Sequence, residues 1–306
     1  MTSFSGVSVV IPCYNALPHV VDAIQSVEAQ STAVDKIIVV DDGSTDDTWV
    51  TLKNLYPLDS EKVQLVRSEN RGACHARNLG LSLVNSEYVA YLDADDYWAS
   101  DKITLQLEQL SENPNLIAVT TDFHFVREDG IVTPGVSTFD WTKESMVSWT
   151  LLGRQAPALN STLLTRRTTM LEVGGYNEDL VSFAEDLDLA WRLFQHGDIK
   201  SVNSNSVSIR FWPGQGHRNL DGMQKSLSKV YGYVAVWEPE LADLAKKQLD
   251  FYFKLRAAVS GRPGLLKIAK VAWVTLRSPA PAIVFFCRRL IGVWRRLMGP
   301  VRLQRG

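Results

Sequence analysis

The sequence predicts an α/β protein with a mostly parallel central sheet flanked by helices, and three observations support this. Short β-branched, apolar segments alternate with segments of helical apolar spacing through residues 7–92. The strands expected at 7–12 and 36–41 are nearly continuous apolar runs, as in parallel strands that are covered on both faces. Polar residues follow three of the expected strands, where ligands bind in such sheets.

Two prolines mark the first strand and the first helix. Residues 7–12 are rich in β-branched side chains and end at Pro12, which predicts a strand. Pro18 suits the first turn of a helix, and apolar residues follow it at helical spacing as far as Val27. The alternation continues with strands expected at 36–41, 63–67 and 87–92 and helices expected at 49–55 and 73–84.

The order of elements is looser after Asp96. Gly174 and Gly175 interrupt the chain before an amphipathic segment. The patterns predict helices at 101–110 and 185–196, strands at 116–121 and 159–165, and a β-turn region at 130–140.

Composition is that of an ordinary soluble globular protein. The chain has 306 residues, of which 45% are hydrophobic and 22% are charged. Its three cysteines cannot form a disulfide framework, which favours a reducing cytoplasm. The first residues lack a signal-peptide pattern, and no apolar stretch reaches the length of about 18 residues that a conventional membrane span needs.

Charge is distributed unevenly along the chain. Residues 262–306 contain ten Lys and Arg and no Asp or Glu, whereas residues 1–261 carry a net charge of −12. A helix at 283–298 would place apolar residues on one face and, on the other, Arg288, Arg289, Arg295 and Arg296. Such a helix is typical of a membrane interface with anionic lipids. The alternative is that its basic face packs on acidic patches of the protein body.

Three carboxylates, Asp93, Asp95 and Asp96, follow the strand expected at 87–92. Clustered carboxylates repel one another, and their burial without partners is costly. A hard divalent cation relieves that repulsion and keeps positions open for phosphate oxygens. The pattern therefore predicts a metal and phosphate site, with a solvated turn or a helix cap as the alternative.

The ends of the first two strands carry residues suited to a nucleotide base. Tyr14 offers a ring face and Asp42 an acceptor for a base N–H, although both also fit structural roles in a core and a turn. No glycine-rich dinucleotide or P-loop motif follows the first strand. Arg71 and Arg77 lie around the start of the helix expected at 73–84, where each could bind phosphate or carboxylate, or be a surface charge.

A second acidic cluster, Glu185, Asp186 and Asp188, begins the helix expected at 185–196. The helix dipole alone favours a carboxylate at this position. That effect does not require three carboxylates after a Gly-Gly turn. One of them could act as a general base on a hydroxyl.

Five motifs occur in a fixed order. They are VVIPCYN at 9–15, IVVDDGSTD at 38–46, ARNLG at 76–80, LDADD at 92–96, and GGY at 174–176 followed by Glu185-Asp186. Together they resemble glycosyltransferase family 2, the inverting enzymes with a GT-A fold, over roughly residues 6–218. The expected organisation is a GT-A catalytic domain at 1–220, a helical extension at 221–261 and a basic, amphipathic, membrane-associating tail at 262–306.

The resemblance implies a nucleotide-diphosphate-sugar donor bound at the strand ends. The base pocket would be lined by Pro12, Tyr14 and Asp42. Arg77 would lie near the nucleotide. Asp95 would be the principal ligand of Mn²⁺ or Mg²⁺, and Asp93 would contact the ribose or the metal through water.

The resemblance also implies the acid–base chemistry. Asp186 would be the catalytic base, with Glu185 as the alternative, and would deprotonate an acceptor hydroxyl that attacks the anomeric carbon. The metal would stabilise the departing diphosphate. Family members often carry a later histidine near the metal, but Trp212 stands at that position here. His217 could replace it as a metal ligand, or be a surface residue.

The implied function is hexosyl transfer for cell-surface polysaccharide or glycolipid synthesis. The expected partners are the donor, a saccharide or lipid-linked acceptor and an anionic membrane surface, and no nucleic acid. The expected location is the cytoplasmic, inner face of the cell membrane. One alternative is a catalytically inactive nucleotide-binding or membrane-scaffold relative, which Trp212 keeps open. A nucleotidyltransferase would normally show a glycine-rich basic loop after the first strand, which this sequence lacks.

Overall fold

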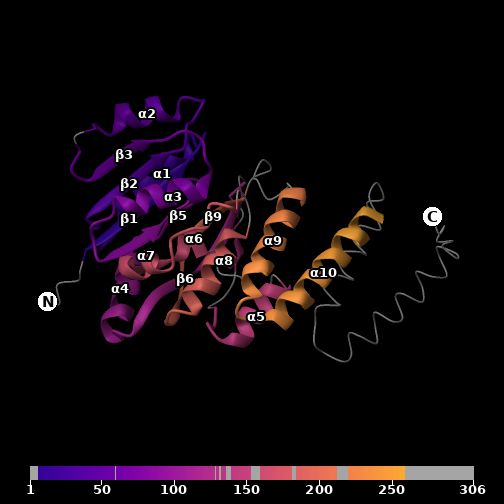
Figure 1. The fold of residues 1–306 in the computed structure, drawn as a ribbon. Coiled ribbons are helices and arrows are strands. Elements are labelled where there is room, and N and C mark those ends of the chain that lie inside the picture. Colours follow the sequence, from indigo (N-terminus) through magenta and orange to yellow (C-terminus); the bar gives the residue numbers. More distant parts are fainter. Residues whose placement is uncertain are drawn as a thin grey trace, which may run out of the picture.

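The computed structural model describes residues 6–58, 60–127, 129–130, 132–135, 139–152, 159–180, 184–211 and 220–258. They form a single mixed sheet with helices on both faces, and two further helices extend away from it (Figure 1). The α/β class that the sequence predicts is confirmed. The basic tail at 262–306 lies outside the described residues.

The first half of the chain alternates strands and helices as predicted. Its elements are β1 (Val7–Cys13), α1 (His19–Glu28), β2 (Lys36–Asp41), α2 (Thr48–Leu55), β3 (Val63–Arg67), α3 (Ala73–Ser82) and β4 (Tyr88–Tyr91). Strand β1 pairs in parallel with both β2 and β4, and β2 pairs in parallel with β3. The carboxyl ends of these four strands therefore meet at one edge of the sheet.

The second half of the chain completes the sheet in a mixed arrangement. Its elements are β5 (Tyr97–Trp98), α4 (Lys102–Glu112), β6 (Leu116–Arg127), β7 (Val132–Pro134), α5 (Lys143–Leu152), α6 (Leu159–Thr162), β8 (Leu164–Arg166), α7 (Arg167–Glu172), α8 (Glu185–Phe194) and β9 (Asp198–Phe211). The strand order is β3-β2-β1-β4-β8-β6-β9-β5, with β7 paired to β6. Strand β8 is antiparallel to both of its neighbours, while β6 and β9 are parallel.

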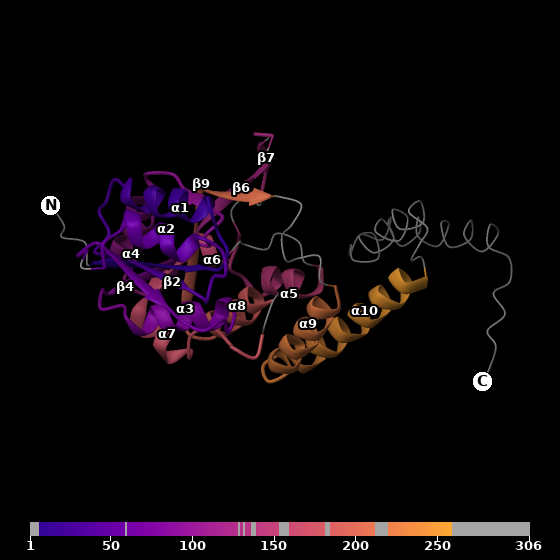
Figure 2. The ribbon, with the colours of Figure 1, turned by 90° about the horizontal axis from the view of Figure 1, so that it is seen from above.

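Alternate side chains of the parallel strands belong to two apolar cores. Val10 and Ile38 pack with α3 on one face, and Val9 and Ile37 pack with α1 on the other. Figure 2 shows α1 and α3 on opposite sides of the sheet. A Cβ atom on Gly80 of α3 would lie 2.3 Å from a methyl carbon of Val10, so this glycine lets α3 approach β1 closely.

The strand predicted at 159–165 is wrong in its first half. Residues Leu159–Thr162 form the short helix α6, and only Leu164–Arg166 is a strand. A short apolar run cannot be assigned to helix or strand by periodicity alone. The helical turn is selected by tertiary contacts, because it lets the Ser161 hydroxyl donate to the Asp96 carboxylate at 2.6 Å.

Strand β9, with 14 residues, is absent from the sequence prediction. It is rich in serine and asparagine, which have little intrinsic preference for strands. It forms because it pairs along most of the length of β6. The region expected to turn, at 130–140, contains β7, which pairs antiparallel with β6.

Two helices, α9 (Leu220–Val234) and α10 (Pro239–Ala258), lie in the region expected to be a helical extension. Val230 and Tyr231 of α9 belong to the core that includes α8, and the Tyr231 hydroxyl donates to the carbonyl of Thr150 at 3.2 Å. The extension therefore rests on the sheet domain. Over the part of the chain that the structure describes, no helix combines the length and the apolarity needed to cross a membrane.

Candidate active site

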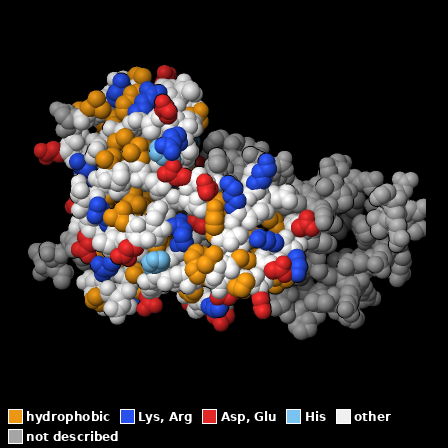
Figure 3. Space-filling view, in the orientation of Figure 1, with side chains coloured by type: hydrophobic (Ala, Val, Ile, Leu, Met, Phe, Trp, Pro, Cys, Tyr) orange, Lys and Arg blue, Asp and Glu red, His pale blue; other side chains and the backbone are white. Residues whose placement is uncertain are grey.

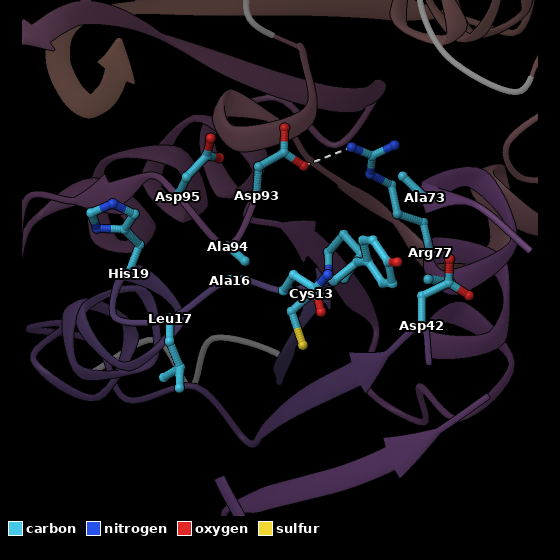
Figure 4. Close-up of a pocket in the computed structure, with 14 residues that line it drawn as sticks. Cys13, Ala16, Leu17, His19, Asp42, Ala73, Arg77, Asp93, Ala94 and Asp95 are labelled. Carbon is cyan, nitrogen blue, oxygen red and sulfur yellow. Dashed lines mark hydrogen bonds and ion pairs between the residues drawn. The ribbon is translucent and has the colours of Figure 1, made fainter. Parts of the chain in front are cut away.

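A pocket of about 390 Å³ opens at the carboxyl ends of β1, β2 and β4. It is lined by the five residues that the sequence predicts for the donor, Pro12, Tyr14, Asp42, Arg77 and Asp93, and by the predicted metal ligand Asp95. In Figure 4 the two carboxylates of Asp93 and Asp95 lie between His19 on one side and Arg77 on the other. The structure thus brings four of the five sequence motifs to one cavity.

The turn after β1 presents Tyr14 to solvent. Asn15 has a left-handed φ of 48° and its side-chain oxygen accepts hydrogen bonds from the backbone N–H groups of Thr45 at 2.8 Å and Asp46 at 3.2 Å. These bonds tie the turn after β1 to the turn after β2. Tyr14 is 47% exposed, so its ring is available to a ligand.

Asp42 is buried and anchors the start of α3. Its carboxylate accepts hydrogen bonds from the Ser68 hydroxyl at 3.1 Å and from the backbone N–H groups of Arg71 at 3.0 Å and Gly72 at 2.7 Å. A carboxylate has about four acceptor positions, so about one is left for a base N–H. The Arg71 side chain is not part of the pocket lining and forms an exposed pair with Glu178 at 3.5 Å.

The three carboxylates after β4 have different surroundings. Asp93 and Asp95 are half-buried in the pocket wall. Asp96 is buried and accepts hydrogen bonds from the Ser161 hydroxyl at 2.6 Å and the backbone N–H of Arg210 at 3.2 Å. Burial, and then the neighbouring carboxylates, raise the pKa of Asp96 well above its usual range. Asp96 therefore fixes the turn and is not directed to a ligand.

Asp93 and Asp95 suit a divalent cation that also binds phosphate. Mg²⁺ commonly takes one or two carboxylates together with substrate phosphates. Among the described residues, no three or more His, Cys, Asp and Glu side chains are grouped to hold a metal. The pair therefore fits a cation that the donor diphosphate completes. The third predicted ligand, His217, and Trp212 lie outside the described residues.

Arg77 contacts both acidic clusters. It is only 3% exposed. One terminal nitrogen donates to Asp93 at 2.6 Å, and the other donates to Glu185 at 3.4 Å. Its guanidinium carbon lies 5.0 Å from the ring centre of Tyr176, within the range of a cation–π contact. The donor residues and the second acidic cluster are therefore joined by one side chain.

Glu185 and Asp186 begin α8, directly after Ala184, which has a left-handed φ of 65°. Burial, and then the charge of Glu185, raise the pKa of Asp186 to about 7, against the opposing effects of the Leu187 N–H and of Arg77. A carboxylate whose pKa lies near neutrality is suited to general-base work. Asp188 is buried and pairs with Arg192 at 2.6 Å, so it stabilises the helix.

Three asparagine and tyrosine residues at the site were not given roles by the sequence analysis. Asn78 holds the backbone of Tyr176 through two hydrogen bonds, each 2.8 Å long. The Tyr176 hydroxyl donates to Asn160 at 3.1 Å, and the Asn160 amide donates to Glu185 at 3.3 Å. Asn78 belongs to the ARNLG motif and Tyr176 to the GGY motif, so these motifs could have indicated both residues. Asn160 follows no pattern, and only the fold places it.

Comparison with protein families decides the classification. The model of the family described as Glycosyl transferase family 2 matches residues 8–159. The chain belongs to glycosyltransferase family 2. The family match includes the strand-end motifs that line the pocket.

Relatives of this chain include proteins named for teichuronic acid biosynthesis and for chondroitin synthesis. The putative teichuronic acid biosynthesis glycosyltransferase TuaG of Bacillus subtilis is 38% identical over 124 residues, which covers 40% of this chain and 49% of TuaG. Chondroitin synthase of Escherichia coli is 28% identical over 234 residues, which covers 73% of this chain and 33% of the synthase. An uncharacterized glycosyltransferase of Rickettsia conorii is 36% identical over 40% of this chain, which covers 20% of that protein. The chain thus spans less than half of each relative's length.

A solved structure supports the GT-A fold of the family 2 chain. The crystal structure of S. aureus TarS 1-349 in complex with UDP-GlcNAc superimposes with a TM-score of 0.62. The sequences are 16% identical, and the match covers 89% of this chain and 79% of the TarS chain. The shared feature at this identity is the fold, and the GT-A prediction is confirmed.

The raised pKa of Asp186 predicts a pH-dependent cost to stability. The folded state holds the Asp186 proton up to a pH of about 7, whereas an unfolded Asp loses it near pH 3.9. The stability that protonated Asp186 contributes is therefore fully present below the pKa of the unfolded state. It is lost as the pH rises through about 7. Asp186→Asn should raise the unfolding temperature by about 2 °C or more at pH 8, with a smaller gain at pH 5. Calorimetry at both values checks this.

The matched control for that measurement is Asp198→Asn, which neutralises an exposed carboxylate at the start of β9. It should show no comparable difference between the two pH values. An equal effect of Asp186→Asn at pH 5 and pH 8 would contradict a raised pKa for Asp186.

Proposed function

We propose that this chain is an inverting glycosyltransferase that moves a sugar from a nucleotide-diphosphate-sugar donor to an acceptor hydroxyl. One observation carries the proposal. The pocket that contains Asp42, Asp93 and Asp95 is joined through Arg77 to Glu185 and hence to Asp186. A nucleotide site, a site for diphosphate and a candidate base are therefore contiguous.

The pocket wall supports the binding of a nucleotide-diphosphate sugar. Tyr14 and Asp42 offer a ring face and a hydrogen-bond acceptor for the base. Asp93 and Asp95 would hold Mn²⁺ or Mg²⁺ against the diphosphate oxygens. A cation bound there would supply Lewis-acid stabilisation of the leaving group. UDP-GlcNAc in the TarS structure is a ligand of this class.

Asp186 is the proposed general base. It accepts the proton of the acceptor hydroxyl while that oxygen forms a bond to the anomeric carbon. The bond between the anomeric carbon and the diphosphate oxygen breaks in the same displacement, and the diphosphate leaves with the electron pair. One displacement inverts the anomeric centre. Glu185 is held by Arg77 and Asn160, so the structure favours Asp186 over Glu185 as the base.

A screen of nucleotide sugars against thermal unfolding tests donor binding. The wild-type protein with Mn²⁺ or Mg²⁺ should unfold at a higher temperature in the presence of one set of nucleotide-diphosphate sugars. A ligand at a free concentration of 100 times its Kd stabilises a protein by about 2.7 kcal/mol. The absence of a shift with every nucleotide sugar and both metals would contradict the proposal.

The proposed acceptor is a growing saccharide or a lipid-linked saccharide of the cell surface. Three relatives support this class by name, since they are a teichuronic acid glycosyltransferase, a chondroitin synthase and a glucosyltransferase for a diphosphoundecaprenol-linked acceptor. Such acceptors place the reaction at the inner face of the cell membrane. The product class is therefore a surface polysaccharide or a glycolipid.

The basic tail is the proposed membrane contact. Residues 262–306 carry ten Lys and Arg and no Asp or Glu. On the face of the described body seen in Figure 3, acidic and basic side chains are interspersed. Each Lys or Arg near an anionic leaflet contributes about 1 kcal/mol of binding. These observations favour lipid phosphates as the partner of the tail.

Deletion of residues 262–306 should release the protein from anionic liposomes. The expected result is loss of co-sedimentation with phosphatidylserine-containing vesicles at moderate salt, because the amphipathic helix that the sequence predicts and its cations are removed. The matched variant replaces only four arginines by glutamine, at Arg288, Arg289, Arg295 and Arg296. It should weaken binding to anionic vesicles and leave binding to neutral vesicles unchanged. Persistent sedimentation of the deleted form would refute the membrane role of the tail.

A further inference from the structure

Glu185 is one of four side chains that form a closed ring of contacts. Arg77 donates to Glu185 at 3.4 Å, and the Asn160 amide donates to the same carboxylate oxygen at 3.3 Å. The Tyr176 hydroxyl donates to Asn160 at 3.1 Å. The Tyr176 ring then packs on the Arg77 guanidinium at 5.0 Å. Four side chains from four segments of the chain thus restrain one another.

Arg77 also contacts the donor side of the site. Its other terminal nitrogen donates to Asp93 at 2.6 Å, the shortest of its contacts. The side chain is almost fully buried, and its Nε has no hydrogen-bond partner. A buried guanidinium is stable only when carboxylates compensate its charge, so removal of either partner is costly. Arg77 is therefore committed to two carboxylates at once.

The three elements that Arg77 joins carry the two halves of the site. Arg77 belongs to α3, Asp93 follows β4, and Glu185 is the first residue of α8. Asp186 is the next residue of that first helical turn. The position of Asp186 relative to the donor pocket therefore depends on the Arg77 contacts.

We propose that Arg77 is a positioning residue that ties the donor side of the site to the base side, by holding Asp93 and, through Glu185, the first turn of α8. This inference rests on the proposed function, since the base side matters only if Asp186 takes a proton. Arg77 transfers no proton itself. Its planar fork reaches two carboxylates in fixed directions, which a lysine cannot reproduce.

The charged groups around Asp186 give the proposal a distinctive signature. Glu185 raises the pKa of Asp186, and Arg77 lowers it; the Leu187 N–H also favours the ionised form. Loss of the Glu185 charge should therefore lower the pKa of Asp186. Loss of the Arg77 charge should raise it. If Arg77 and Glu185 had merely structural roles, their replacement would not shift the pKa of Asp186 in opposite directions.

The test compares Arg77→Gln, Arg77→Lys and Glu185→Gln with the wild type. We expect Arg77→Gln to reduce kcat by about 100-fold, which is the scale of a small misplacement of reacting groups. The same variant should move the acid limb of the pH–kcat profile to higher pH. Glu185→Gln should move that limb to lower pH. Arg77→Lys should restore the position of the limb but not the full kcat, because it keeps the charge and loses the fork.

A second readout needs no turnover. In each variant, the pH dependence of the difference in unfolding temperature between the forms with and without Asp186→Asn reports the pKa of Asp186. Its midpoint should rise in Arg77→Gln and fall in Glu185→Gln. If Arg77→Gln does not fold, Arg77→Lys still tests the role of Arg77, because it should lower kcat while leaving this midpoint at the wild-type pH.

The matched control is Arg166→Gln. Arg166 donates to Glu87 at 2.7 Å and lies over the Tyr88 ring at 5.3 Å, so it copies the Arg–Glu–Tyr chemistry at the other end of β4. It should cost stability without moving the pH profile. Unmoved or parallel shifts in the two site variants would overturn the inference. Shifts as expected in a protein that turns over no nucleotide sugar would overturn only the proposed function.

Discussion

Asp186→Asn should remove sugar transfer and leave donor binding intact. Asparagine has the size of aspartate but cannot accept the hydroxyl proton at neutral pH. General-base catalysis contributes about 10²–10⁴-fold, so kcat should fall at least 100-fold while the donor Kd changes little. Calorimetric titration of the donor and a transfer assay on the same preparation separate the two quantities.

The pH profile of the wild type belongs to the same prediction. A base must be deprotonated to act, and the pKa of Asp186 is raised to about 7. The rate should therefore rise with pH through about 7 and level off above it. Asp198→Asn, at the exposed start of β9, is the control and should keep the wild-type profile. Full activity of Asp186→Asn would move the base to Glu185 or elsewhere.

Asp95→Ala should abolish the metal-dependent part of donor binding. Asp95 lines the pocket beside Asp93, and two carboxylates are a minimal protein contribution to a cation that the diphosphate completes. Changes to residues behind a metal ligand alone cost about 10–100-fold in metal affinity, so loss of a ligand should cost at least as much. Donor titrations with and without Mn²⁺ measure the difference.

The control for the metal prediction is Asp101→Ala. Asp101 is exposed at the start of α4, and its side chain forms no capping hydrogen bond there. It should preserve the response to Mn²⁺. If Asp95→Ala kept the wild-type gain in donor affinity on addition of Mn²⁺, Asp95 would be removed from the metal site.

The parallel half of the fold could be predicted because its local signals agree with one another. Val9 and Val10 belong to different cores, which is why β1 reads as a continuous apolar run. Strand β9 could not be predicted in this way, because its polar sequence gains its structure from pairing with β6. Ser161 shows the same limit, since its helical turn is selected by Asp96, 65 residues away.

The site residues that come directly after strands could be predicted from the sequence. The contacts between residues far apart in the chain could not. Tyr14, Asp42 and Asp93 follow three parallel strands, so topology alone brings them together. The pairing of Arg77 with Glu185 joins residues 108 positions apart. No spacing rule encodes such a contact, and the positioning role of Arg77 appears only when α3 and α8 are packed in three dimensions.

The most direct test of the account is the stereochemistry of transfer, followed by proton NMR with the nucleotide sugar that the binding screen selects. With a donor whose sugar is α-linked to the diphosphate, the wild type should release nucleoside diphosphate and form a β-linked product. That result is the expected outcome of a single displacement in which Asp186 deprotonates the acceptor. An α-linked product would contradict it.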